Sequence, residues 1–199
     1  MKRINFKIHL VIILMLSVLT ATSSLFADDK PKSNVDVFVA TGVRALPGVM
    51  WGFIPSPVSA AVAVDINRIR IRGDFSYHLA VNAVHSTAGG GYLFIPKGKN
   101  AAETGGFQLK IPIMFDAGII SGTTEADDGY DDKITWLLLG PSASVDFSWW
   151  KAHRLGFTIS FKVGYDFAID LDSTYPDGYS SAEDTIGIGD VSVLFGITI

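Results

Sequence analysis

The chain has 199 residues, with 16 basic and 20 acidic side chains, a formal net charge of −4 and no cysteine. The acidic balance and the lack of a basic cluster argue against a nucleic-acid partner, and the missing cysteine excludes disulfides and a lipid-bearing cysteine. Mean hydropathy is +0.33 and only 18% of residues are charged. These values are high for a soluble domain, and apolar strand faces in contact with lipid would explain them.

The N-terminus has the order of a secretory signal peptide. Three basic residues precede an apolar segment at 10–19, and mostly small residues follow it. We expect a signal peptide at 1–27 and one outer-membrane β-barrel domain at 28–199. An uncleaved membrane anchor is the alternative, but the apolar segment is shorter than the about 20 residues that a transmembrane helix needs.

Eight segments predict β-strands, because apolar and polar side chains alternate along most of them. In chain order they are residues 35–45, 57–66, 68–80, 87–96, 106–120, 133–147, 154–170 and 184–199. The clearest pattern is at 155–170, where every odd position is large and apolar and every even position is small, polar or charged. Soluble strands usually have about 5–6 residues, whereas a tilted membrane-spanning strand needs about 9–11. The fourth segment is the weakest because it contains Gly89, Gly90 and Gly91.

Turn-forming residues separate these segments. Short or moderate connections are predicted at 65–67, 96–106 and 148–153, and longer exposed loops at 46–56, 121–132 and 171–183. Short turns at one end and longer loops at the other are typical of bacterial outer-membrane barrels. An even number of strands predicts that both mature termini lie on the periplasmic side.

Alternation alone leaves open which face points outward, because a soluble barrel would bury its apolar face. The polar faces are rich in Gly, Ser, Ala and Thr and poor in the Lys and Glu of soluble surfaces. The apolar faces hold more aromatic residues than an eight-stranded barrel can enclose. We expect Trp149 and Trp150 at one membrane interface and Trp51 and Phe53 at the other. The alternative is that these aromatics are ordinary core residues.

With the apolar faces outward, charged side chains of both signs point into the lumen. We expect this lumen network to contain Arg68, Arg70, Arg72, Asp74, Lys110, Asp116, Asp146, Lys162 and Asp166, with Asp170 nearby. An isolated buried charge is prohibitively costly, so these groups should pair. The sequence therefore predicts that Arg70 or Arg72 contacts a lumen aspartate and that the barrel is plugged.

Candidate catalytic and metal-binding residues are few. The candidates for nucleophilic chemistry are His78, His85, His153, Ser76 and Ser86, and no Ser-His-acid spacing stands out among them. The acidic residues of 125–132 lack the order of a calcium-binding EF-hand loop. We therefore expect no catalytic site, no metal and no cofactor.

Two strand motifs carry a resemblance to known proteins. Residues 110–113 (KIPI) and 139–142 (LGPS) resemble strand motifs of small outer-membrane β-barrel proteins of the OmpW, OmpX and OmpA transmembrane type. The match covers nearly all of the mature chain, although such barrels typically end in an aromatic residue and this chain ends in Ile199. The resemblance implies an all-β, eight-stranded antiparallel up-and-down transmembrane barrel. It also implies assembly by the barrel assembly machinery and a surrounding outer-membrane lipid.

The resemblance to the OmpW type further implies a non-enzymatic binder of, or narrow conduit for, small apolar molecules. Two alternatives remain: a structural or surface-interaction barrel with exposed acidic loops, and a lipid-modifying barrel enzyme. An apolar upper lumen or a lateral gap favours the first function. A sealed lumen with ordered protruding loops favours the second, and a Ser-His-acid cluster at the outer interface favours the third.

Overall fold

The computed structural model describes residues 35–48, 52–79, 82–125, 131–151, 155–171 and 186–199. These residues belong to the unit Val35–Ile199. The predicted signal peptide, Trp51, His153 and most of the loop predicted at 171–183 lie outside the described residues. Among the residues that the structure describes, no helix is long and apolar enough to cross a membrane.

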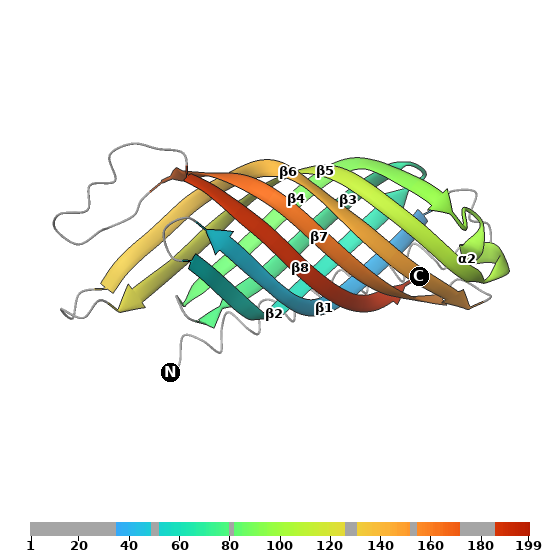
Figure 1. Cartoon of the computed structure of the whole chain (residues 1–199), viewed down its shortest axis with the longest axis horizontal. Helices are drawn as coiled ribbons and strands as arrows, with labels where there is room; N and C mark the ends of the chain where they lie inside the picture. Colours follow the sequence, from blue (N-terminus) through green and yellow to red (C-terminus); the bar gives the residue numbers. More distant parts are fainter. Residues whose placement is uncertain (1–34, 49–51, 80–81, 126–130, 152–154, 172–185) are drawn as a thin grey trace. The chain divides into compact units, whose positions relative to one another are not determined.

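Eight antiparallel strands form a closed barrel (Figure 1). Their bounds are β1 Val35–Gly48, β2 Gly52–Ile66, β3 Ile69–His78, β4 Ala83–Lys97, β5 Gly106–Glu125, β6 Asp131–Lys151, β7 Leu155–Asp170 and β8 Ile186–Thr198. Each strand pairs with its neighbours in the sequence, and β1 pairs with β8 to close the barrel. The predicted fold class, an eight-stranded antiparallel up-and-down barrel, is confirmed.

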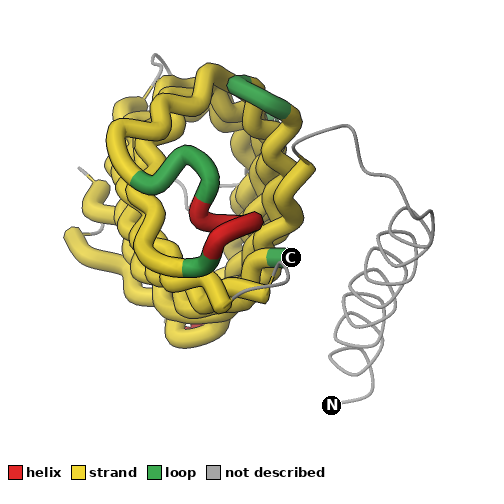
Figure 2. The backbone as a smooth tube through the Cα atoms, turned by 90° about the vertical axis from the view of Figure 1, so that its right-hand side faces the viewer, coloured by secondary structure: helices red, strands yellow, loops and turns green. Residues whose placement is uncertain are grey.

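The barrel has two ends, which we name by the chain termini. The terminal end carries Val35 and Ile199, and the other end is called the distal end. Three connections lie at the terminal end: the β2–β3 turn, the β6–β7 connection and the β4–β5 connection with the short helix α2 (Ala101–Thr104). In a view onto this end, α2 and the loop beside it lie across part of the ring of strands (Figure 2).

Side chains alternate between the outer wall and the lumen along each strand. In β7, Phe161 and Phe167 are 47% and 48% exposed, whereas Ser160 and Lys162 are buried. The same alternation puts the buried charged and polar residues inside, together with some apolar ones, and the exposed large apolar residues outside around the barrel. The outer wall is therefore the apolar surface that a lipid environment requires, and the lumen holds the polar groups.

The strands run further than the turn signals predicted. The loops expected at 46–56 and 121–132 are largely strand, because β1 reaches Gly48 and β5 reaches Glu125. The turn expected from 148 is wrong as well, since β6 continues to Lys151. Proline and acidic residues are poor strand formers in general, yet here the neighbouring strand supplies the ladder of hydrogen bonds.

The fourth strand is longer than predicted and includes the three glycines. A Cβ atom added to Gly89 would lie 1.9 Å from the Asp116 Oδ1 atom, and one added to Gly91 would lie 1.9 Å from the Ile113 carbonyl oxygen. Glycine is required there because β5 and the Asp116 side chain approach the β4 backbone too closely for any other residue. The glycine run therefore belongs to a packed strand.

Candidate functional site

The lumen near the terminal end contains a cluster of buried ion pairs. The Arg70 guanidinium on β3 donates to Asp65 on β2, with Nε 2.5 Å from Oδ1, and to Asp146 on β6. The Lys110 ammonium on β5 lies 2.8 Å from Asp65 and 2.7 Å from Asp36 on β1. Five charged side chains from five strands therefore meet in one network.

A second cluster of ion pairs lies further along the lumen. Arg72 contacts Asp74 with Nη2 2.7 Å from Oδ1. The Lys162 ammonium on β7 lies 3.0 Å from Asp74 and 2.6 Å from Asp116 on β5. A lysine on one wall thereby bonds to aspartates on other parts of the barrel wall.

Arg44 on β1 and Asp190 on β8 add a two-point pair beside this cluster. The Arg44 Nε and Nη2 atoms donate to the two carboxylate oxygens of Asp190 at 2.7 and 2.6 Å. Asp190 also lies 3.7 Å from Lys162. This pair links the β1–β8 seam, where the barrel closes, to the central charges.

Several of these bonds cross the full width of the barrel. In a closed ring of eight strands, β3 lies opposite β7 and β1 opposite β5. The Lys162–Asp74 and Lys110–Asp36 pairs join these opposite strands. Charged side chains that meet across the middle occupy the space that an open channel would need. Ion-paired side chains therefore lie across the middle of the lumen at these two levels.

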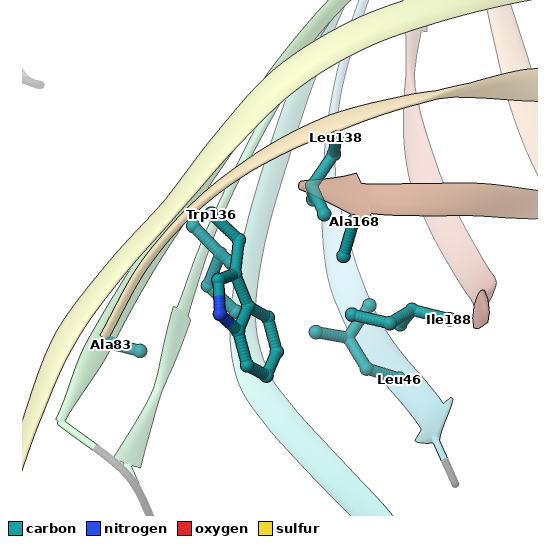
Figure 3. Close-up of a cluster of buried hydrophobic side chains, with 7 residues drawn as sticks. Leu46, Ala83, Trp136, Leu138, Ala168 and Ile188 are labelled. Carbon is teal, nitrogen blue, oxygen red and sulfur yellow. The ribbon is translucent and has the colours of Figure 1, made fainter. Parts of the chain in front are cut away.

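The distal part of the lumen contains a cluster of apolar side chains. Seven buried side chains form one cluster inside it, and we call them the distal apolar cluster: Leu46, Ala83, Ile120, Trp136, Leu138, Ala168 and Ile188. They come from β1, β4, β5, β6, β7 and β8. Figure 3 shows the Trp136 ring directed toward Leu46 and Ile188. A second buried apolar cluster lies nearer the terminal end, on β1, β2 and β8, and contains Phe38, Ala40, Ala61, Ala63 and Leu194. The distal cluster differs in drawing on six strands, so it lines more of the lumen.

Three polar side chains on β3 and β4 lie beside the distal apolar cluster, since His78 is the register partner of Ala83. The His78 and His85 rings stack with centroids 5.8 Å apart, and the Ser76 Oγ atom lies 3.3 Å from the His78 Nε2 atom. All three side chains are fully buried in the lumen. A lipid-modifying enzyme needs such groups at the outer interface, so this arrangement does not offer its nucleophile to lipid. In the described part of the chain, no group of three or more His, Cys, Asp or Glu side chains could hold a metal ion.

The β4–β5 connection lies across part of the terminal mouth (Figure 2). The Gln108 side chain donates to the Gly98 carbonyl at 3.0 Å and accepts from the Trp150 Nε1 atom at 3.0 Å. The Lys110 ammonium lies 5.7 Å from the centre of the Trp150 ring. Ala101 of α2 is buried. These contacts fix the connection over the charged network.

Trp150 was expected at the membrane interface, and this prediction is wrong. Trp150 is buried in the lumen, whereas Trp149 is 47% exposed on the outer wall. Because β6 continues through both residues, their side chains must point to opposite faces. Phe53 lies in β2, in the register pair with Pro47, and its side chain is outside the described structure, as is the whole of Trp51.

Two other expected lumen residues lie at strand ends. Arg68 belongs to the β2–β3 turn after Asn67, whose φ is 56°, and its guanidinium donates to the Leu93 carbonyl at 3.5 Å. β3 begins at Ile69, so Arg68 lies just before the strand, and its side chain is half-buried. Asp170 is exposed at the distal end of β7. Asp166, in contrast, is buried on the lumen side of β7.

Four network residues were missed in the sequence. Asp36, Arg44, Asp65 and Asp190 each hold an ion pair in the lumen. Asp65 had been assigned to the turn, but its register partner is Arg70, so the two side chains are direct cross-strand neighbours. Arg44 and Asp190 could have been found from strand alternation, because both are even-numbered and the even-numbered residues of β1 and β8 point inward.

The β2–β3 seam is incomplete at its distal end. Pairing of β2 with β3 ends at Val58 and Tyr77, although β2 stays paired with β1 as far as Gly52. Pro57 has no N–H group with which to continue the ladder. The Ser56 hydroxyl lies 2.7 Å from the Tyr77 carbonyl and bridges the two strands there. A single side-chain bond thus replaces the backbone ladder at this point.

Comparison with known proteins supports the fold. No protein-family model matches the chain, and no curated protein matches it. The crystal structure of Neisserial surface protein A is similar with a TM-score of 0.53 and 9% sequence identity, over 83% of this chain and 96% of that one. A major outer membrane protein from Thermus thermophilus gives a TM-score of 0.49 and 15% identity, over 82% and 98%. The first similarity shows that the chain has the fold of an outer-membrane β-barrel.

Proposed function

We propose that the protein is a non-enzymatic barrel of the bacterial outer membrane that binds small apolar molecules in the distal part of its lumen. The observation that carries the proposal is the distal apolar cluster. A membrane barrel normally has a polar interior. Apolar side chains from six strands inside the lumen would hold a small apolar molecule away from water, at roughly 25 cal/mol for each Å² of apolar surface that it buries.

The charged clusters set the limit of that binding site. The crossing pairs made by Lys162 and Lys110 fill the lumen on the terminal side, so a bound molecule cannot pass straight through. The incomplete β2–β3 seam supports a sideways route instead. Val58 and Leu79, on either side of that seam, are apolar and 56% and 62% exposed on the outer wall. The same proposal places both mature termini in the periplasm and names outer-membrane lipid and the barrel assembly machinery as partners.

Titration with the apolar fluorescent probe 1-N-phenylnaphthylamine tests this function. The folded barrel in lipid nanodiscs should show saturable binding above that of empty nanodiscs. Leu138→Gln puts a polar group into the distal apolar cluster and should weaken the saturable component at least tenfold. Leu137→Gln, on the neighbouring outward-facing residue, is the matched control and should bind like the unchanged protein. Heat-modifiable mobility on gels shows that each variant is folded.

Two outcomes would contradict the proposal. One is the absence of saturable binding by the unchanged protein. The other is equal binding by folded Leu138→Gln and Leu137→Gln. Ile188→Gln provides a second lumen variant on β8, in case the Leu138 change prevents folding, and it should lose binding in the same way.

A surface-interaction role is the second candidate, and the β5–β6 hairpin favours it. These two strands stay paired as far as Glu125 and Asp131, whereas β5 leaves β4 at Gly122 and β6 leaves β7 at Trp136. The hairpin therefore projects as regular structure beyond its neighbours. Joining Gly122 to Ile134 by an Asn-Gly turn removes it. Loss of adhesion of expressing cells to an epithelial monolayer, with probe binding intact, would support this role, and unchanged adhesion would exclude it.

A further inference from the structure

Aromatic side chains gather on one part of the outer wall at the terminal end. Phe107 on β5, Trp149 on β6 and Phe157 on β7 lie side by side, and we call these three residues the aromatic shelf. The ring centroids are 5.7 Å apart for Phe107 and Trp149 and 6.3 Å apart for Trp149 and Phe157. Trp149 and Phe157 are 47% and 48% exposed. The shelf is thus a continuous apolar surface across three strands.

Two lysines lie at the borders of the aromatic shelf. The Lys97 ammonium, at the end of β4, lies 5.6 Å from the centre of the Phe107 ring. Lys151 is two residues beyond Trp149 on β6, so it points to the same face, and it is exposed. A cation over an aromatic ring is held by the electrostatic attraction of the ring face. The shelf therefore carries positive charge on the side toward the end of the barrel.

Among the described residues, exposed aromatic side chains at the terminal end lie on β4 to β7, because Tyr92 and Phe94 on β4 form a further pair with centroids 4.7 Å apart. On the opposite part of the terminal end, the outward residues of β3 are the aliphatic Ile69 and Ile71. At the distal end, Tyr165 and Phe167 form an aromatic pair with centroids 5.4 Å apart, the exposed charge beyond them on their own strand is Asp170, and the exposed Lys133 lies on β6. An ordinary aromatic belt would surround the barrel at both interfaces. The placement on half of the strands, with a lysine held over the Phe107 ring, indicates a more selective contact.

We propose that the aromatic shelf with Lys97 and Lys151 binds the headgroup region of an acidic phospholipid. The two ammonium groups would meet the negatively charged phosphate, and the rings would lie against the glycerol and upper acyl chains. Tryptophan favours the membrane interface because its ring contacts hydrocarbon while its N–H group stays near water. A basic side chain near an anionic lipid surface contributes about 1 kcal/mol, which corresponds to about a fivefold preference for each lysine. The site lies outside the barrel and is independent of the apolar site in the lumen.

Quenching of tryptophan fluorescence by brominated lipid tests the site. The folded protein is placed in phosphatidylcholine vesicles that contain a small fraction of phosphatidylglycerol brominated on its acyl chains. The quenching that disappears in Trp149→Phe belongs to the shelf. We expect this quenching to exceed that obtained with the same fraction of brominated phosphatidylcholine. Lys97→Gln with Lys151→Gln should reduce the preference for phosphatidylglycerol by about tenfold or more.

Lys133→Gln is the matched control, because Lys133 is an exposed lysine near the distal end. It should leave the preference at the shelf unchanged. Added inorganic phosphate should not displace the lipid, since the acyl chains hold it against the rings. Equal quenching by the two brominated lipids would overturn the proposal, and so would an equal loss in Lys133→Gln. Probe binding in the lumen is read separately, so failure of one proposal does not affect the other.

Discussion

Removal of the Arg70 guanidinium should strongly destabilise the folded barrel. Arg70 is 1% exposed and donates to Asp65 through Nε and Nη2, at 2.5 and 2.8 Å, and to Asp146 through Nη1. In Arg70→Met, Asp65 keeps Lys110 as a partner. Asp146 keeps only the hydroxyl groups of its neighbouring serines among the bonds described for it. It becomes a buried carboxylate without a cation, which costs about 3–5 kcal/mol.

A second change separates this charge effect from lost packing. Asp146→Asn in the Arg70→Met background removes the uncompensated carboxylate. The double variant should therefore be destabilised by less than the sum of the two single variants, with an interaction of at least about 1 kcal/mol. Lys151→Met, at an exposed lysine, should change the free energy of unfolding by no more than about 0.5 kcal/mol.

Urea titration of the barrel in phosphatidylcholine vesicles measures these free energies. Tryptophan fluorescence follows unfolding, and heat-modifiable gel mobility reports the folded fraction. A change in Arg70→Met that is as small as that in Lys151→Met would refute the buried network. Strictly additive effects of Arg70→Met and Asp146→Asn would refute the direct pairing of the two groups.

Three further predictions follow from the barrel geometry. Phe161→Arg, in the middle of the outward row of β7, should destabilise the barrel in vesicles by about 2–4 kcal/mol. Leu155→Arg, at the strand end, should cost no more than about 1 kcal/mol. Equal costs would contradict the lipid-facing assignment. The chain has no cysteine, so single cysteines can be introduced and labelled. A membrane-impermeant maleimide added to intact cells should label Thr123→Cys at the distal end and not Lys99→Cys at the terminal end. The reverse pattern would mean that the topology is inverted. Gly89→Ala should lower the free energy of unfolding by about 1–3 kcal/mol, and with it the unfolding midpoint, because the added Cβ would collide with β5. The same change at the next residue, where the nearest atom is 3.6 Å away, should be nearly neutral, and a neutral Gly89→Ala would argue against the close β4–β5 approach.

The strands and their faces could be predicted because successive side chains of a barrel strand point alternately to lipid and to the lumen. Apolar and polar residues therefore alternate along the sequence. The β7 segment 155–170 shows this most clearly, and its predicted and observed bounds differ by one residue. Strand ends were less predictable. Pro47 and Pro55 signal a turn locally, yet both lie in strands that remain paired with each other. Local turn propensity was overridden by the partner strand.

The partners inside the lumen could be predicted only in part. The inward row of Arg70 and Arg72 was visible, since alternation fixes the face of a side chain. Which carboxylate each one meets depends on register and on bonds across the barrel, such as Arg70 with Asp146, which are 76 residues apart. Trp150 shows the same limit, because its inward position depends on β6 continuing past the expected turn.

Ion conductance across planar bilayers tests the plugged lumen most directly. With Arg70, Lys110 and Lys162 paired across the barrel, the folded protein should give no steady conductance above that of the bare bilayer. Folding of the inserted protein is verified by heat-modifiable mobility of the same preparation. A steady, ohmic conductance of the kind that a water-filled channel gives would contradict the ion-paired plug, and with it the assignment of the distal lumen as a closed apolar site.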